Sequence, residues 1–169
     1  ARSGTEVVVM EVSAHALALK KELPVCYDVA VFTNLTRDHL DFFGTMERYG
    51  NAKKQLFTKQ KCKMAVLNAD DDFSRSLAKG VKQMTYGLDT PADAFALVRT
   101  VSLRGLRAIF NLKDDLCEVN VPMTGRHNLS NALAAACTAR CLGADMGAIT
   151  DGIGMTKVDG RLEWVGAVN

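Results

Sequence analysis

Three short apolar runs, each followed by polar residues and separated by helix-favouring segments, constrain the fold of this chain most. The runs lie at 6–11, 28–33 and 63–67. Continuous apolar and β-branched residues are typical of strands covered on both faces, as in a parallel sheet. The segments 13–21 and 45–57 favour helices, with Ser13 as the N-cap of the first and Thr45 near the start of the second. The alternation predicts an α/β domain with a mostly parallel sheet, flanking helices and right-handed crossovers.

The pattern changes after about residue 85. Three shorter runs follow at 94–102, 106–112 and 117–121, separated by turn-forming residues. They predict an antiparallel meander that forms a small sub-sheet beside the main sheet. An alanine-rich helix is then expected at 128–142, closed by Gly143, and a shorter helix near 146–153.

Composition narrows the class of protein. The 169 residues carry 21 basic and 19 acidic side chains, a net charge of +2, which gives no strong attraction to nucleic acid or an anionic membrane. Five cysteines, an odd number without a CxxC pair, indicate neither a disulfide framework nor a zinc site. No apolar stretch is long enough to span a bilayer. We therefore expect one cytoplasmic domain, and the start without methionine favours a piece of a longer protein.

Polar residues follow each of the three buried runs, at 11–15, 33–39 and 68–70. Open α/β sheets bind ligands beyond the carboxyl ends of their strands, so these groups predict a site at one sheet edge. Taken singly, each has a structural alternative: Glu11 and Ser13 as helix-start groups, and His39 as a surface histidine. Glu11 and His39 could hold a divalent metal, but magnesium needs more oxygen ligands than this pair supplies.

Five motifs resemble, in order and spacing, the central domain of the UDP-N-acetylmuramoyl-tripeptide synthetases of the Mur ligase family. They are MEVSAHAL at 10–17, FTNLTRDHLD at 32–41, NAK at 51–53, GRHNLSNALAA at 125–135 and GRLE at 160–163. The motifs run over nearly the whole chain. The residues of the first two motifs are most similar to those of the ligase that adds the third residue of the peptidoglycan stem peptide.

The resemblance implies a magnesium site formed by Glu11, His39 and a carbamylated Lys53. Carbamylation turns the lysine amine into a carboxylate, which supplies the missing oxygen ligand. The structural alternative for Lys53 is an ordinary solvated helix lysine.

The resemblance also implies the remaining site residues. Asn128 and Asn131 would face the adenine of ATP, Arg161 would hold ATP phosphate, Asn34 would shape the cofactor site, and Ser13 and Lys21 would contact the UDP-muramoyl dipeptide. The alternatives are an N-cap for Asn128 and a surface cation for Arg161. Lys21 stands where arginine is common and lacks its bidentate fork. Phe43 stands where histidine is common, which makes a polar role there doubtful.

The implied reaction uses ATP and Mg²⁺ to activate UDP-N-acetylmuramoyl-L-alanyl-D-glutamate as an acyl phosphate, which the amine of an amino acid then attacks. The sequence contains no GxxxxGK[ST] phosphate loop, which relatives carry upstream of Glu11. We therefore interpret 1–160 as the central domain without its phosphate-loop segment and 161–169 as the start of a hinge. This piece is expected to be inactive alone, and its uncovered sheet edge to favour self-association.

Two other functions stay open. One is a related ATP-dependent amide ligase, such as folylpolyglutamate synthetase. The other is a non-catalytic module that binds a nucleotide or a cell-wall precursor. The identity of the third amino acid also stays open, because its pocket would lie in a C-terminal domain.

Overall fold

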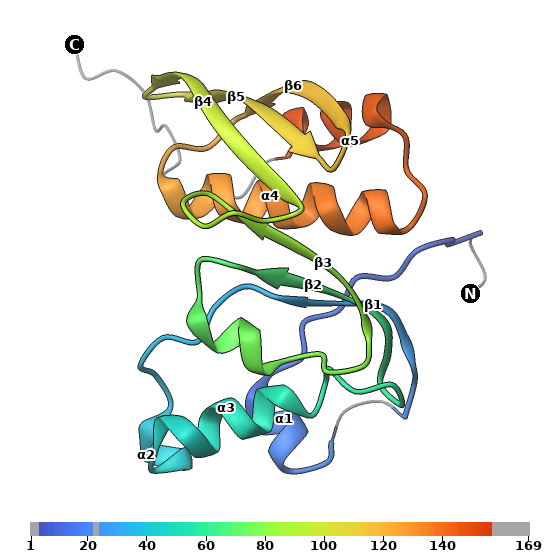
Figure 1. Ribbon diagram of the computed structural model, residues 1–169, viewed down its shortest axis with the longest axis vertical. Coiled ribbons are helices and arrows are strands. Elements are labelled where there is room, and N and C mark those ends of the chain that lie inside the picture. Colours follow the sequence, from blue (N-terminus) through green and yellow to red (C-terminus); the bar gives the residue numbers. More distant parts are fainter. Residues whose placement is uncertain (1–3, 22–23, 157–169) are drawn as a thin grey trace.

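The computed structural model describes residues 4–21 and 24–156 and contains one curved sheet flanked by helices (Figure 1). Within this described part the sheet has six strands in the order β1-β2-β3-β4-β5-β6. They are β1 (Tyr27–Phe32), β2 (Cys62–Asn68), β3 (Lys82–Gly87), β4 (Ala94–Ser102), β5 (Gly105–Leu112) and β6 (Asp115–Val121). Strands β1 to β4 run parallel to one another, and the pairs β4–β5 and β5–β6 are antiparallel. The predicted α/β class is confirmed.

The antiparallel strands continue the main sheet and do not form a separate sub-sheet, which corrects that part of the prediction. The junction is short: β3 and β4 pair only at Tyr86 with Ala94 and at Gly87 with Phe95. Beyond it, β4 and β5 pair along their length. β3 itself was not predicted as a strand. Its sequence, KQMTYG, holds few apolar residues, so it lacks the apolar run that identifies β1 and β2.

The predicted strand at 6–11 is wrong. The segment forms no strand, and Val8 and Val9 are 80% and 94% exposed. A strand needs a neighbour to satisfy its backbone N–H and C=O groups, and within the described residues β1 pairs only with β2. The apolar run therefore stays unpaired in the structure.

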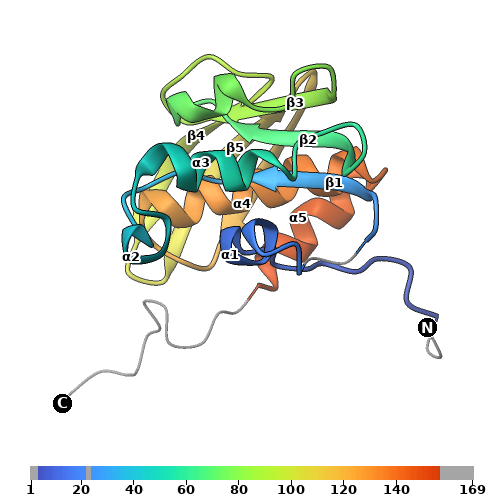
Figure 2. The same cartoon turned by 90° about the horizontal axis from the view of Figure 1, so that it is seen from below.

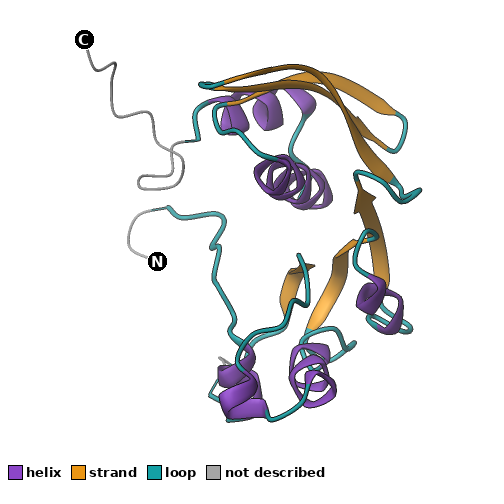
Figure 3. Cartoon of the chain, turned by 90° about the vertical axis from the view of Figure 1, so that its left-hand side faces the viewer, coloured by secondary structure: helices purple, strands orange, loops and turns teal. Residues whose placement is uncertain are grey.

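The helices cover both faces of the sheet. They are α1 (Ala14–Ala18), α2 (Leu40–Phe43), α3 (Met46–Lys54), the 3₁₀ helix η1 (Asp72–Ser76), α4 (Arg126–Cys141) and α5 (Met146–Gly154). Figure 3 shows α4 and α5 inside the curve of the sheet, and Figure 2 shows α1 and α3 beside β1 and β2. In β2, Val66 packs on the α4 side while Ala65 and Leu67 pack on the α1 side. Burial on both faces explains why this strand has no polar alternation.

The helix ends follow the expected chemistry. Ser13 and Thr45 are N-caps, because their hydroxyls accept hydrogen bonds from the backbone N–H of Ala16 and Arg48. The long helix α4 begins at Arg126 after the N-cap Gly125, two residues before the predicted start.

Among the described residues, no helix combines the length and the apolar character that crossing a bilayer requires.

Candidate functional site

The carboxyl ends of β1 and β2 meet at one edge of the sheet, as predicted. The Asn68 side-chain amide, which is buried, donates a hydrogen bond of 2.7 Å to the backbone oxygen of Thr33. The Asp71 carboxylate accepts a hydrogen bond of 2.6 Å from the backbone N–H of Leu35. The loop that follows β1 is therefore held to the end of β2.

Asp70, at the same edge, has a structural role in the fold. Its carboxylate accepts backbone N–H groups from Leu88, Asp89 and Thr90 at 2.7, 3.1 and 2.8 Å. Burial raises the pKa of this carboxyl, but these hydrogen bonds to the ionised form outweigh burial and the pKa lies below its ordinary value. Asp70 fixes the loop after β3.

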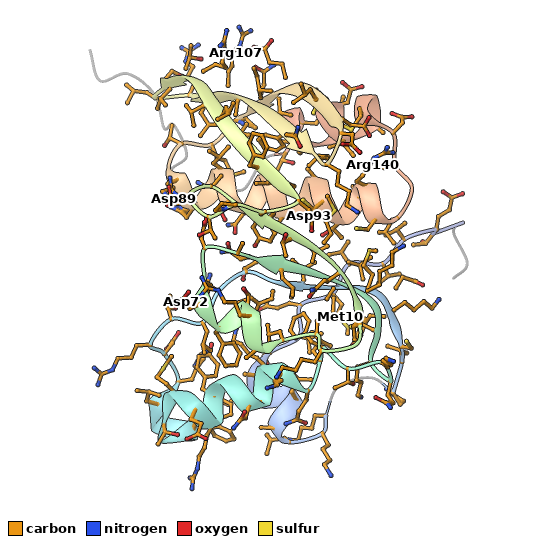
Figure 4. All side chains as sticks on the ribbon, viewed as in Figure 1. Met10, Asp72, Asp89, Asp93, Arg107 and Arg140 are labelled. Atoms are coloured by element: carbon orange, nitrogen blue, oxygen red, sulfur yellow. The ribbon has the colours of Figure 1, made fainter. Side chains whose placement is uncertain are left out.

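A cavity of about 670 Å³ lies between the N-terminal segment and the open edge of β1. Residues 6–12 line one side, including Met10, which Figure 4 labels. Residues 27–33 line another side, and Lys53 of α3 also contributes. Glu11 and Lys53, two of the predicted metal ligands, therefore line the same cavity.

His39, the third predicted ligand, does not line this cavity and lies in an aromatic cluster. Its ring contacts the ring of Tyr49 with centroids 5.6 Å apart. The ammonium nitrogen of Lys53 lies 5.2 Å from the centre of the same Tyr49 ring. Tyr49 thus contacts two of the three predicted ligands.

The chemistry of these donors decides whether they suit a magnesium ion. No group of three or more His, Cys, Asp or Glu side chains suited to a metal occurs among the described residues. A lysine ammonium cannot ligate a cation, because all its protons are donors. Glu11, His39 and Lys53 therefore fit magnesium only if Lys53 is carbamylated, since a carbamate adds the oxygen ligands that this ion prefers.

The two asparagines of α4 differ in their surroundings. Asn128 is buried and donates a hydrogen bond of 2.7 Å to the backbone oxygen of Thr124. Its alternative role as N-cap is wrong, because Gly125 is the N-cap. Asn131 is exposed and lies on the same side of the helix, three residues further on. Arg161 lies outside the described residues.

The predicted substrate and cofactor residues near α1 and β1 are exposed. The Ser13 hydroxyl caps α1, which confirms the structural alternative for this residue. Lys21 lies just beyond α1, and Asn34 follows the end of β1. Phe43 is buried and stacks on Tyr49 with ring centroids 5.2 Å apart, an apolar setting that agrees with the doubt about a polar role there.

Sequence reasoning assigned no role to Tyr49, His15 or Asp71, which lie beside the predicted residues. A signal for Tyr49 was available. It precedes Lys53 by four residues on a predicted helix, and residues at this spacing are neighbours on the helix surface. No comparable signal exists for His15 or Asp71, because their contacts come from segments distant in sequence.

The fold and the polar edge define an open α/β domain with a ligand-binding region at the carboxyl ends of its parallel strands. The chain belongs to the Mur ligase middle domain family, whose model matches residues 1–139. This finding confirms the resemblance inferred from the five motifs.

Individual relatives agree with this family. A UDP-N-acetylmuramoyl-L-alanyl-D-glutamate--L-lysine ligase of Staphylococcus haemolyticus is 42% identical over 166 residues, covering 94% of this chain and 34% of the relative. A solved UDP-N-acetylmuramoyl-L-alanyl-D-glutamate--2,6-diaminopimelate ligase gives a TM-score of 0.78 at 30% identity, over 86% of this chain and 31% of that one. A MurF ligase from Thermotoga maritima in complex with ADP gives a TM-score of 0.68 at 25% identity, over 86% and 33%. The chain spans about a third of the length of these relatives.

Proposed function

We propose that this chain is the ATP-handling part of a ligase that adds the third amino acid to UDP-N-acetylmuramoyl-L-alanyl-D-glutamate. Membership of the Mur ligase middle domain family supports the reaction class. The names of the lysine and diaminopimelate ligases support the substrate, and the relative solved with ADP supports the nucleotide. Because those two relatives take different amino acids, the proposal leaves the third residue open. The protein would work in the cytoplasm.

The proposed reaction has two steps. The γ-phosphoryl group of ATP passes to the D-glutamate carboxylate, which forms an acyl phosphate and releases ADP. The amine of the amino acid then attacks the acyl carbon, an amide bond forms, and phosphate leaves with the bonding electrons. A bound Mg²⁺ would offset negative charge on the phosphoryl group.

Glu11, His39 and carbamylated Lys53 would hold this ion. One observation carries the assignment: Lys53 lines the cavity that Glu11 lines and contacts the tyrosine ring that His39 contacts. Glu11 and His39 are far apart in sequence, yet Lys53 is linked to the first through the shared cavity and to the second through the Tyr49 ring. In carbamylation the neutral Lys53 amine adds to carbon dioxide and loses a proton.

The other site residues keep the roles that the resemblance implied. Asn131 offers its exposed amide to adenine, with Asn128 one turn earlier. Arg161 would hold phosphate and Asn34 would shape the nucleotide site. Ser13 and Lys21 would contact the UDP-muramoyl dipeptide.

A phosphate loop is the missing part of this machinery. The open edge of β1 and the cavity beside it suit an additional parallel strand, which would cover the edge. We propose that a phosphate-loop strand occupies this position in the complete ligase, with 1–160 as its central domain and 161–169 leading into the next one. The 169-residue chain alone would then have no ligase activity.

Replacement of Lys53 in the complete ligase tests the proposal. We expect Lys53→Ala to lower substrate-dependent phosphate release by at least about 100-fold, and a small carboxylate such as acetate to restore part of it. Lys54→Ala, on the same helix, is the matched control and should keep near-normal activity. Peptide mapping at alkaline pH with bicarbonate should find one added carbon dioxide on Lys53. Full activity of Lys53→Ala, or an unmodified Lys53 in an active enzyme, would contradict the proposed metal site.

A further inference from the structure

Five aromatic rings form a cluster that includes His39, one of the proposed metal ligands. His15 contacts three of the other four rings. The members are His15, His39, Phe42, Phe43 and Tyr49. The His15 ring lies 4.9 Å from His39, 4.4 Å from Phe42 and 5.2 Å from Phe43, measured between centroids. These separations are typical of attractive aromatic pairs or slightly closer. None of the roles proposed above uses His15.

The His39 ring is contacted by two rings at nearly right angles. The interplanar angle is 85° with His15 and 84° with Tyr49. The two partners come from different elements, His15 from α1 and Tyr49 from α3, which pack against each other. Rotation of the imidazole about its Cβ–Cγ bond would disturb both edge-to-face contacts together. The contacts with His15 and Tyr49 therefore favour one orientation of the His39 ring.

The backbone at His39 makes such support necessary. Its φ of 54° and ψ of 24° lie in the left-handed region, which costs energy for a residue other than glycine. Its side chain makes no capping hydrogen bond to α2 and is 45% exposed. The Asp38 carboxylate accepts a hydrogen bond from the His39 backbone N–H at 2.7 Å, which fixes the main chain. The imidazole Nε2 lies 3.6 Å from the exposed Asp38 carboxylate, and the ring contacts with His15 and Tyr49 restrain the imidazole further.

We propose that His15 is a positioning residue that, together with Tyr49, clamps the imidazole of His39 in the orientation needed to ligate a divalent cation. The ligand role of His39 rests on the proposed function, whereas the clamp itself can be tested without any metal. His15 acts through the face and edge of its ring and not through its nitrogen atoms. An aromatic ring without nitrogen should therefore replace it, and a polar side chain of similar size should not.

Histidine resonances measured by NMR on this chain test the clamp directly. The sequence has three histidines, His15, His39 and His127, and α4, which carries His127, packs on the opposite face of the sheet from α1 and α3. We expect His15→Gln to move the ring signals of His39 toward those of free histidine. His15→Phe should keep them displaced. His127→Gln is the matched control, and it should leave the His39 signals unchanged.

Titration with Mn²⁺ alone then links the clamp to cation binding. We expect Mn²⁺ to broaden the His39 signals of the wild type, with about 10-fold weaker binding in His15→Gln and near wild-type binding in His15→Phe. His39 signals that do not respond to His15→Gln would overturn the clamp. So would equal changes in His15→Phe and His15→Gln. If Mn²⁺ fails to broaden His39 in wild-type chain that peptide mapping shows to be carbamylated at Lys53, the proposed metal site is contradicted, while the ring signals still decide the clamp.

Discussion

Asp70 shows at the scale of one residue how a carboxylate beside a ligand-binding edge can serve the fold. Its folded-state pKa lies below the ordinary value of about 3.9, because three backbone N–H groups bind the ionised form. A lowered folded pKa contributes stability above the unfolded pKa, and this contribution is lost as pH falls through the folded pKa.

We predict that Asp70→Asn lowers the free energy of unfolding at pH 7 by on the order of 1 kcal/mol, after allowance for solvent screening. The difference from wild type should shrink as pH falls below the unfolded-state pKa of about 3.9, because the unfolded chain then gains a proton, and it should vanish once pH has also fallen through the lower folded pKa. Urea denaturation at several pH values measures it. Asp72→Asn is the control, because the Asp72 side chain is 88% exposed and pairs with Arg75 at the surface. A pH-independent difference would show that the charge of Asp70 is not responsible.

Among single residues, the sequence nominated His39 and Lys53 as candidate ligands but gave no information on their surroundings. The imidazole of His39 suggests ligand chemistry by its type, whereas Lys53 entered only through the motif that resembles the Mur ligase family. The ring of Tyr49 between them depends on how the loop after β1 folds back over α3. The left-handed backbone of His39 and the contact with His15 likewise arise only from tertiary packing.

At the scale of elements, α3 is the helix on which the candidate site depends, since it carries Tyr49 and Lys53. Thr45 begins it by accepting a hydrogen bond of 3.2 Å from the backbone N–H of Arg48. Glu47 in the first turn and Lys53 with Lys54 in the last turn complement the helix dipole.

We predict that Thr45→Ala destabilises the protein by about 1 kcal/mol, because an orphan N–H group of α3 loses its partner. Thr45→Ser should retain most of the stability, since serine caps as well as threonine. Thr58→Ala, at an exposed threonine after the helix, is the control. Thermal and urea unfolding compare the three variants. Equal stability of Thr45→Ala and wild type would show that the Thr45 cap does not stabilise α3.

Most regular elements were predictable, and the failures have different physical causes. Strands β1 and β2 each hold a continuous apolar run, interrupted only near their ends by Asp28, Lys63 and Asn68, and α4 is rich in alanine over four turns. The short α2 and η1 were missed, since four or five residues are too few to show a helical period. The segment at 6–11 has the composition of a strand, but composition does not provide a neighbouring strand.

At the scale of the whole molecule, the unpaired edge of β1 is the feature that decides whether copies of this chain associate. Within the described residues, β1 has a partner on one side only. The adjacent cavity is lined largely by apolar residues, and the Tyr27 hydroxyl on its lining is buried without a hydrogen-bond partner among the described residues. Next to it, Val8 and Val9 are largely exposed. Unpaired edges and exposed β-branched runs are sites of strand addition between molecules.

We therefore predict that the 169-residue chain self-associates through this edge, with the apolar run of one copy adding to β1 of another. Light scattering should give an average mass that rises with protein concentration. Val9→Lys should keep the chain monomeric, because a charge on the added strand opposes pairing. Leu103→Lys is the matched control: Leu103 is 88% exposed but lies at the β4–β5 turn, so association should persist. A mass independent of concentration in the wild type would contradict strand addition, and equal effects of both variants would indicate general hydrophobic association instead.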